Sequence, residues 1–219
     1  MRHVFGAELD QLRLQVEVMG VRVDQNLERM RDVLVSGDLG QAERALNADD
    51  DIDAMNVSLT ERCYDLLVRE QPVASDLRFV VSVLRVLSEL ERVGDLALRV
   101  VKLAPEQGYL ASSPRTFDIV LTMADQAVEV YRTALAAWAA QDLGVATALA
   151  VMSTTMDACN ERLTAELLQL KGPDAVRVAM GTLVAGRSLE RIADHASIIG
   201  ARLRYLITGD PDHLATEVR

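Results

Sequence analysis

Apolar residues recur along most of the chain at spacings of three and four, which is the period of an amphipathic helix. The series Val83, Leu87, Leu90, Ala97 and Val101 is one example. β-Branched residues rarely alternate with polar ones, so the pattern of a half-buried strand is missing. The pattern therefore predicts an all-α protein.

Prolines and two short polar segments divide this pattern into six long helices. Proline breaks helix interiors but suits first turns and connections, and the five prolines stand at positions 72, 105, 114, 173 and 211. The segments 37–40 and 141–144 each offer an aspartate that can cap the next helix and a glycine that can relax the backbone. The predicted helices cover residues 3–36, 39–70, 73–104, 114–141, 143–170 and 173–208.

The second half of the chain repeats the first. Asp38-Leu-Gly recurs as Asp142-Leu-Gly, and Asp53-Ala-Met-Asn recurs as Asp157-Ala-Cys-Asn, both at an offset of 104 residues. Leu-Glu-Arg at 90–92 recurs at 189–191, at an offset of 99, so the first copy has a loop that is five residues longer. Three helices are the smallest unit that encloses a core between antiparallel neighbours. We expect two tandem, pseudo-symmetric, antiparallel three-helix bundles, over residues 1–108 and 109–219.

Composition limits the possible partners and compartment. Half of the 219 residues are hydrophobic, and the net charge of −10 disfavours direct binding of nucleic acid or of anionic membrane surfaces. The most apolar windows are too short or too broken by charge to span a bilayer, so we expect contact with membranes only through protein partners. Cys63 and Cys159 lie far apart without a Cys-x-x-Cys spacing, which fits buried thiols in the reducing cytoplasm.

Carboxylates on apolar helices are the main candidates for chemistry. Glu91 and Asp95 lie four residues apart on one helix face, where like charges repel unless a cation sits between them. Asp49 and Asp53 on the preceding helix can complete an oxygen shell suited to magnesium, manganese or iron. The sequence therefore predicts a first metal site at these four residues.

A second metal site is predicted at the repeated motif. Glu190 and Asp194 repeat the spacing, Asp157 lies on the preceding helix, and the nitrogen of His195 would favour iron, zinc or manganese. Ser153, Thr154 and Thr155 replace the acidic run of the first half, which weakens this site. Residues 1–108 carry 13 basic and 20 acidic side chains, against 10 and 13 in the remainder. An alternative at both places is that Arg92 and Arg191 neutralise the carboxylates in ion pairs, with no metal.

The sequence has no motif for catalysis. It lacks a glycine-rich phosphate loop, Gly-x-Ser-x-Gly, His-Glu-x-x-His and the Glu-x-x-His pairs of di-iron carboxylate proteins. We expect no enzyme activity. A metal-dependent helical-bundle enzyme and a purely structural helical adaptor remain as alternatives to a regulator.

Three segments resemble the PhoU family of bacterial phosphate-signalling regulators. They are REQPVASDLR (69–78), SELERVGDLALRV (88–100) and RSLERIADHASII (187–199), and the likeness extends over about residues 3–208. The resemblance implies a cytoplasmic protein that contacts the ATPase subunit of a phosphate ABC transporter and a phosphate-sensing histidine kinase. Such a protein represses the phosphate-starvation response when phosphate is plentiful. The resemblance also implies a homodimer, and some family members bind multinuclear metal clusters at this motif.

Overall fold

The structure is a computed structural model that describes residues 2–218, with the side chains of all of these but 2–4, 150, 151, 153, 154 and 216–218. Helices account for nearly all of the described residues, and no strand occurs among them. The long helices are α1 (Arg2–Ser36), α2 (Leu39–Glu70), α3 (Ala74–Val101), α5 (Pro114–Ala140), α6 (Leu143–Leu167) and α7 (Ala175–Thr208). Three short elements complete the chain: the 3-10 helix η1 (Ala104–Glu106), α4 (Gln107–Ala111) and the 3-10 helix η2 (Pro211–Val218).

All six predicted helices are present, and their ends lie within three residues of the predicted positions. Pro114 is the first residue of α5, and Pro105 lies in the first turn of η1, as the role of proline as a boundary predicts. The largest differences are at the ends of α3 and α6, each of which ends three residues before its predicted position. In the connection after α6, Gly172 adopts a φ of +108°. The short elements η1, α4 and η2 were not predicted.

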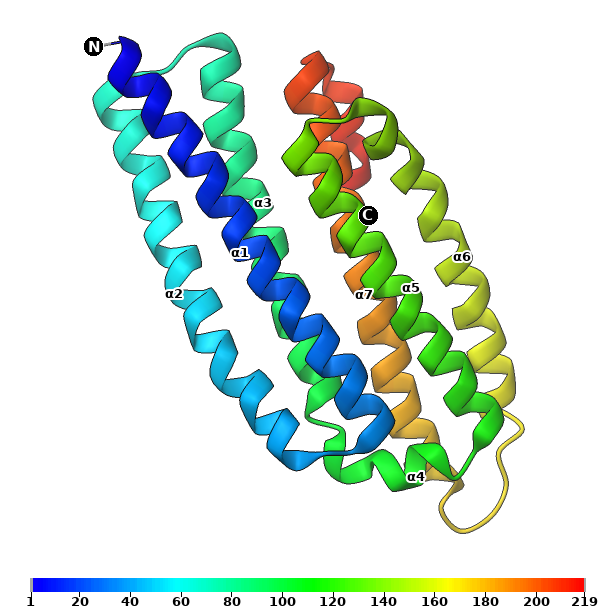
Figure 1. Cartoon of the computed structure of the whole chain (residues 1–219). Coiled ribbons are helices and arrows are strands. Elements are labelled where there is room, and N and C mark those ends of the chain that lie inside the picture. The colour runs from blue at the N-terminus through cyan, green and yellow to red at the C-terminus, as the bar shows by residue number, and fades with distance from the viewer. Residues whose placement is uncertain (1, 219) are drawn as a thin grey trace.

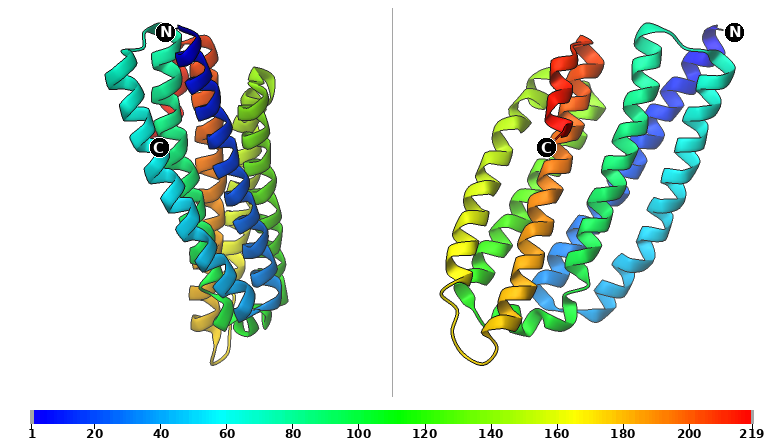
Figure 2. Two further views of the ribbon diagram at one scale, coloured as in Figure 1. Left: turned by 60° about the vertical axis from the view of Figure 1, so that its left-hand side comes forward. Right: turned by 180° about the vertical axis from the view of Figure 1, so that it is seen from behind.

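The long helices form two antiparallel three-helix bundles that lie side by side (Figure 1). Helices α1, α2 and α3 form the first bundle, and α5, α6 and α7 form the second, with η1 and α4 crossing between them at one end. The bundles meet along two seams, α3 against α7 and α1 against α5 (Figure 2). Buried hydrophobic residues of both halves belong to one continuous core cluster. The repeats are therefore packed as one body.

The α1–α5 seam depends on a glycine. A Cβ atom on Gly20 would come within 2.4 Å of Cδ1 of Leu135 on α5, so a larger residue at this position would push the helices apart. The hydroxyl of the buried Tyr131 donates a hydrogen bond of 2.8 Å to the carbonyl of Gly20. This contact fixes the height at which the two helices cross.

The two polar segments between helices have the same construction in both repeats. Asp38 caps α2 by accepting a hydrogen bond from the Gln41 amide, and Asp142 caps α6 in the same way, each at 3.0 Å. The predicted caps are thus confirmed. The predicted role of glycine is confirmed in the first repeat, where Gly37 adopts a left-handed backbone (φ +67°) one residue before the cap. In the second repeat Gln141, and not Gly144, adopts this conformation (φ +53°).

Candidate functional site

The four residues of the first predicted metal site lie together between α2 and α3. Asp49 is half-buried against α3, and its Oδ1 lies 3.3 Å from the place that a Cβ atom on Gly94 would occupy. The glycine of the Leu-Glu-Arg-Val-Gly-Asp motif thus makes room for a carboxylate of the neighbouring helix. Exposed Asp53 and Asp95 and the half-buried Glu91 surround it.

The charges of this first cluster are not balanced by nearby cations. Burial, followed by the negative charges of Asp53, Asp95, Asp50 and Glu91, raises the pKa of Asp49 to about 6. Burial and the charges of Asp95 and Asp53 raise the pKa of Glu91, and only Arg92 acts against them. A cation placed here would be stabilised by several carboxylates.

At the second predicted site, Asp157, Glu190 and Asp194 lie close enough for their charges to interact. Burial is the main cause that raises the pKa values of Glu190 and Asp194. The negative charge of Asp157 raises both further, and that of Asp194 also raises the pKa of Glu190. Glu190 differs from its counterpart Glu91 because its two oxygens are occupied. Asn160 donates to Oε1 at 3.1 Å, and Arg187 pairs with Oε2 at 2.6 Å. The first repeat has Ser88 at the position of Arg187, so Glu91 has no counterpart of this ion pair.

Neither cluster is arranged as a finished metal site. Within the part of the chain that the structure describes, no three acidic, histidine or cysteine side chains converge to hold one ion. Ser153 and Thr154, which were expected to weaken the second site, lie outside the described side chains. Metal binding therefore stays a prediction at both places, and it would require the carboxylates to rotate toward a common point.

His195 does not join the second site, contrary to the prediction. Its Nδ1 lies 2.5 Å from Oε2 of Glu89 on α3, and both side chains are buried. Because a carboxylate only accepts, the hydrogen of this bond belongs to Nδ1. The other oxygen of Glu89 pairs with Arg85 at 2.9 Å. The physical reason for the difference is that consecutive helical residues point in different directions, so Asp194 and His195 cannot face the same site.

Glu89 was missed by the sequence analysis. It precedes the Leu-Glu-Arg motif and lies on the apolar stripe formed by Ser82, Val86 and Val93, all of them buried. A glutamate on such a stripe needs a partner, and that signal was present in the sequence. The partner is in the other repeat, across the α3–α7 seam.

The predicted alternative of ion pairs between the motif arginines and the carboxylates is not what the structure has. Neither Arg92 nor Arg191 belongs to any ion pair or hydrogen bond among the described residues. Both line a small cavity at the α3–α7 seam instead.

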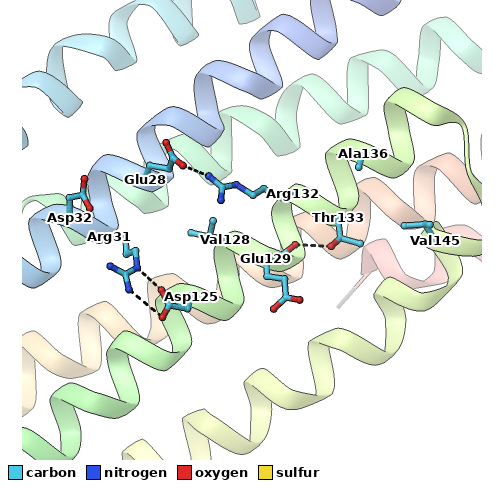
Figure 3. Close-up of a pocket in the computed structure, with 10 residues that line it drawn as sticks. All are labelled: Glu28, Arg31, Asp32, Asp125, Val128, Glu129, Arg132, Thr133, Ala136 and Val145. Carbon is cyan, nitrogen blue, oxygen red and sulfur yellow. Dashed lines mark hydrogen bonds and ion pairs between the residues drawn. The ribbon is translucent and has the colours of Figure 1, made fainter.

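The opposite seam, between α1 and α5, holds a larger groove of about 750 Å³ (Figure 3). Its two arginines are paired: Arg31 Nε lies 2.5 Å from Oδ1 of Asp125, and Arg132 bonds Glu28 and, at 2.7 Å, Asp24. Glu28 and Arg132 are separated by the repeat offset of 104 residues, so equivalent positions carry opposite charges and neutralise each other. The positive charges of both arginines are therefore already neutralised, and acidic residues outnumber basic ones along the wall of the groove.

Two simpler predictions concern thiols and membrane spans. Cys63 and Cys159 are free and buried, as expected, and burial raises the pKa of Cys63 to about 12, which makes it unreactive. Within residues 2–218, no helix is long and apolar enough to cross a membrane.

Comparisons with known proteins match both repeats. A model of the PhoU domain family matches residues 16–104 and 120–203, one segment in each bundle. A phosphate-specific transport system accessory protein PhoU homolog of Pseudomonas putida is 32% identical over 94% of this chain and 81% of its own length. The crystal structure of PhoU from Pseudomonas aeruginosa superimposes with a TM-score of 0.89, at 33% identity over 94% of this chain and all of that one.

A second solved structure shows the same architecture. The phosphate transport system regulatory protein PhoU from Streptococcus pneumoniae gives a TM-score of 0.82 at 25% identity, over 94% of this chain and 98% of that chain. The matched proteins are named as accessory or regulatory proteins, in agreement with the expectation that the chain is not an enzyme.

Proposed function

The chain belongs to the PhoU family, and we propose that it regulates phosphate homeostasis by repressing phosphate uptake and the phosphate-starvation response when phosphate is plentiful. The observation that carries this proposal is the family match in both bundles, together with relatives named for the phosphate-specific transport system. The role is one of contact and control rather than catalysis.

Phosphate uptake tests this role in the cell. In a strain that lacks the gene for this chain, uptake of radiolabelled phosphate from phosphate-rich medium should exceed that of the parent, and the restored gene should lower it again. Equal uptake in all three strains would contradict the proposal. A variant that disrupts the core, such as Gly20→Leu at the α1–α5 crossing, serves as the negative control for complementation.

The partners that we propose are the ATPase subunit of the phosphate ABC transporter and the phosphate-sensing histidine kinase, met at the cytoplasmic side of the membrane. The names of the relatives as transport-system proteins support the first of these. Tagged chain purified from phosphate-replete cells should carry the ATPase subunit and the kinase with it, and the Gly20→Leu variant should not. Recovery of neither protein, in cells where uptake is repressed, would contradict the contacts but not the role.

We further propose that the first acidic cluster binds a divalent cation such as manganese, iron, zinc or magnesium. Asp49, Asp53, Glu91 and Asp95 would hold it. The raised pKa values of Asp49 and Glu91 support the proposal because repulsion among these carboxylates contributes to them, after burial. The second cluster is the weaker candidate, because Arg187 already neutralises Glu190. Bound metal would relieve the repulsion among the carboxylates.

Thermal unfolding with and without added metal tests this site. Asp95→Asn keeps the shape of the side chain but removes its charge, so stabilisation by Mn²⁺, Fe²⁺ or Zn²⁺ should shrink. Asp194→Asn, at the equivalent position of the second repeat, is the matched control and should retain most of the effect. If the wild-type protein melts at the same temperature with each metal and with chelator, the first site does not bind metal.

A further inference from the structure

A small cavity lies at the α3–α7 seam, and no residue that lines it also lines the α1–α5 groove. Its volume of about 160 Å³ has room for roughly five water molecules. Helix α3 contributes four of the residues that line it and α7 contributes two: Arg92, Asp95, Leu96, Arg99, Arg191 and His195. Leu96 and His195 are buried and form the floor, whereas the arginines and Asp95 are exposed and form the rim.

The cavity is positively charged in a protein that is acidic as a whole. Three arginines and one aspartate line it, which leaves two positive charges in excess, although the whole chain carries −10. Arg92, Arg99 and Arg191 take part in no ion pair or hydrogen bond among the described residues. Their guanidinium groups, each with five donors, are therefore available to a ligand.

The repeat explains how these charges come together. Arg92 and Arg191 are the same residue of the duplicated Leu-Glu-Arg motif, and the packing of α3 on α7 brings both to one cavity. At the α1–α5 seam the equivalent residues Glu28 and Arg132 have opposite charges and bind each other. At the α3–α7 seam the equivalent residues have the same charge and repel, so a negative ion between them would stabilise the arrangement.

We infer that this cavity binds one small oxyanion of the phosphate class, held by Arg92, Arg99 and Arg191. Guanidinium groups bind tetrahedral oxyanions through paired, charge-assisted hydrogen bonds, which single out phosphate and sulfate over chloride. The cavity is too small for a nucleotide, and no phenylalanine, tyrosine or tryptophan is among the described residues that line it. The anion site rests on the cavity and its charges, whereas the choice of phosphate over other oxyanions rests on the proposed function.

The position of the cavity links phosphate to the rest of the molecule. A bound ion would connect Arg92 of the first repeat with Arg191 of the second, beside the buried contact between Glu89 and His195. It would also offset the positive charge of the arginines and add negative charge beside Asp95, which belongs to the first acidic cluster as well. Phosphate would thus act on both the seam and the cluster from one place.

Calorimetric titration of the full chain with inorganic phosphate, at constant ionic strength and after treatment with chelator, tests the inference. The wild-type protein should bind one equivalent, and Arg92→Gln and Arg191→Gln should each weaken binding by about tenfold or more, because each removes a charge-assisted contact. Arg44→Gln is the matched control: Arg44 is exposed on α2 and donates to Gln41, its one hydrogen-bond partner among the described side chains, and its loss changes the net charge equally. Sulfate should compete with phosphate, and chloride should not.

Several results would overturn the inference. They are the absence of binding at millimolar phosphate, equal weakening by Arg44→Gln and the cavity variants, or equal competition by chloride. Binding of ATP or a phosphoserine peptide without binding of the free ion would also contradict it. Circular dichroism verifies the fold of each variant, and Arg99→Gln, at the exposed rim, replaces any that does not fold. A chain that represses uptake but binds no phosphate refutes only this inference, and one that binds phosphate without affecting uptake refutes only the proposed function.

Discussion

Asp49 shows how a single residue departs from its ordinary behaviour because of its neighbours. Its carboxylate is packed against Gly94 and is surrounded by other carboxylates, which together raise its pKa to about 6 from a reference of 3.8. A carboxyl group with a raised pKa in the folded state destabilises the fold when it is ionised. That cost is present above pH 6 and disappears as the pH falls toward the unfolded value.

We predict that Asp49→Asn stabilises the metal-free protein at pH 7. A rise of the pKa from 3.8 to about 6 corresponds to at most about 3 kcal/mol, and solvent screening around this half-buried group reduces the expected gain to about 1 kcal/mol. The gain should shrink between pH 6 and pH 4, where the wild-type carboxyl group becomes protonated. Urea unfolding at several pH values, followed by circular dichroism, measures it. A stabilisation independent of pH, or a loss of stability at pH 7, would show that the charge of Asp49 is not the cause.

Individual residues were predictable where local geometry decides their role. Helical geometry and residue type predict that Asp38 and Asp142 cap the helices that follow them. Helical spacing also predicts that the carboxylates of Glu91 and Asp95 lie close enough to repel each other. The contact of His195 with Glu89 does not, because it joins residues 106 positions apart across two repeats. Helical geometry did contain the information that His195 and Asp194 point in different directions. The left-handed backbone at Gln141 was not predictable from a residue type that rarely adopts it.

At the level of elements, α3 and α7 determine how the two repeats meet. Each is the most deeply buried helix of its bundle, and they pack on each other along the seam. Proline positions predicted their approximate ends, whereas η1 and α4 are too short to show a hydrophobic period. The sequence pattern of a helix shows which face is apolar but not which other helix covers it. The α3–α7 pairing therefore needed the structure.

We predict that His195→Leu destabilises the seam strongly, although leucine is the residue at the equivalent position, Leu96. The substitution leaves the buried Glu89 with Arg85 as its remaining partner and removes one charge-assisted hydrogen bond, so it should cost about 1 to 3 kcal/mol. The double variant Glu89→Leu/His195→Leu removes both polar groups and should recover most of that loss. Chemical unfolding of the two variants and the wild-type protein separates the cases. If the double variant is no more stable than the single one, the pair does not account for the loss.

For the whole molecule, the internal repeat predicted two three-helix bundles, and the structure has them. The predicted boundary between residues 108 and 109 lies inside α4, and the core continues from one bundle into the other. Repetition in sequence shows that two units are alike, but it does not show that they share a core. In the sequence, apolar residues that pack against the other bundle cannot be told apart from those that pack within their own bundle.

The long outer sides of the bundles lead to a prediction about assembly. Leu14, Val18 and Val21 are 59%, 43% and 50% exposed, and their spacing of four and three residues places them in one apolar stripe on α1. We expect a homodimer in solution, with twice the mass of the 24.0 kDa chain. Light scattering over micromolar to sub-millimolar concentrations measures this mass, and a monomer throughout that range would contradict the expectation.

The central claim is that this chain keeps the phosphate-starvation response off when phosphate is abundant. A starvation-induced promoter fused to a fluorescent reporter measures this directly in phosphate-rich medium, in the parent strain, in a strain that lacks the gene and in that strain with the gene restored. The account predicts low fluorescence in the parent, high fluorescence in the deletion strain and a return to the parental level on restoration. Fluorescence that stays at the parental level in the deletion strain would contradict it.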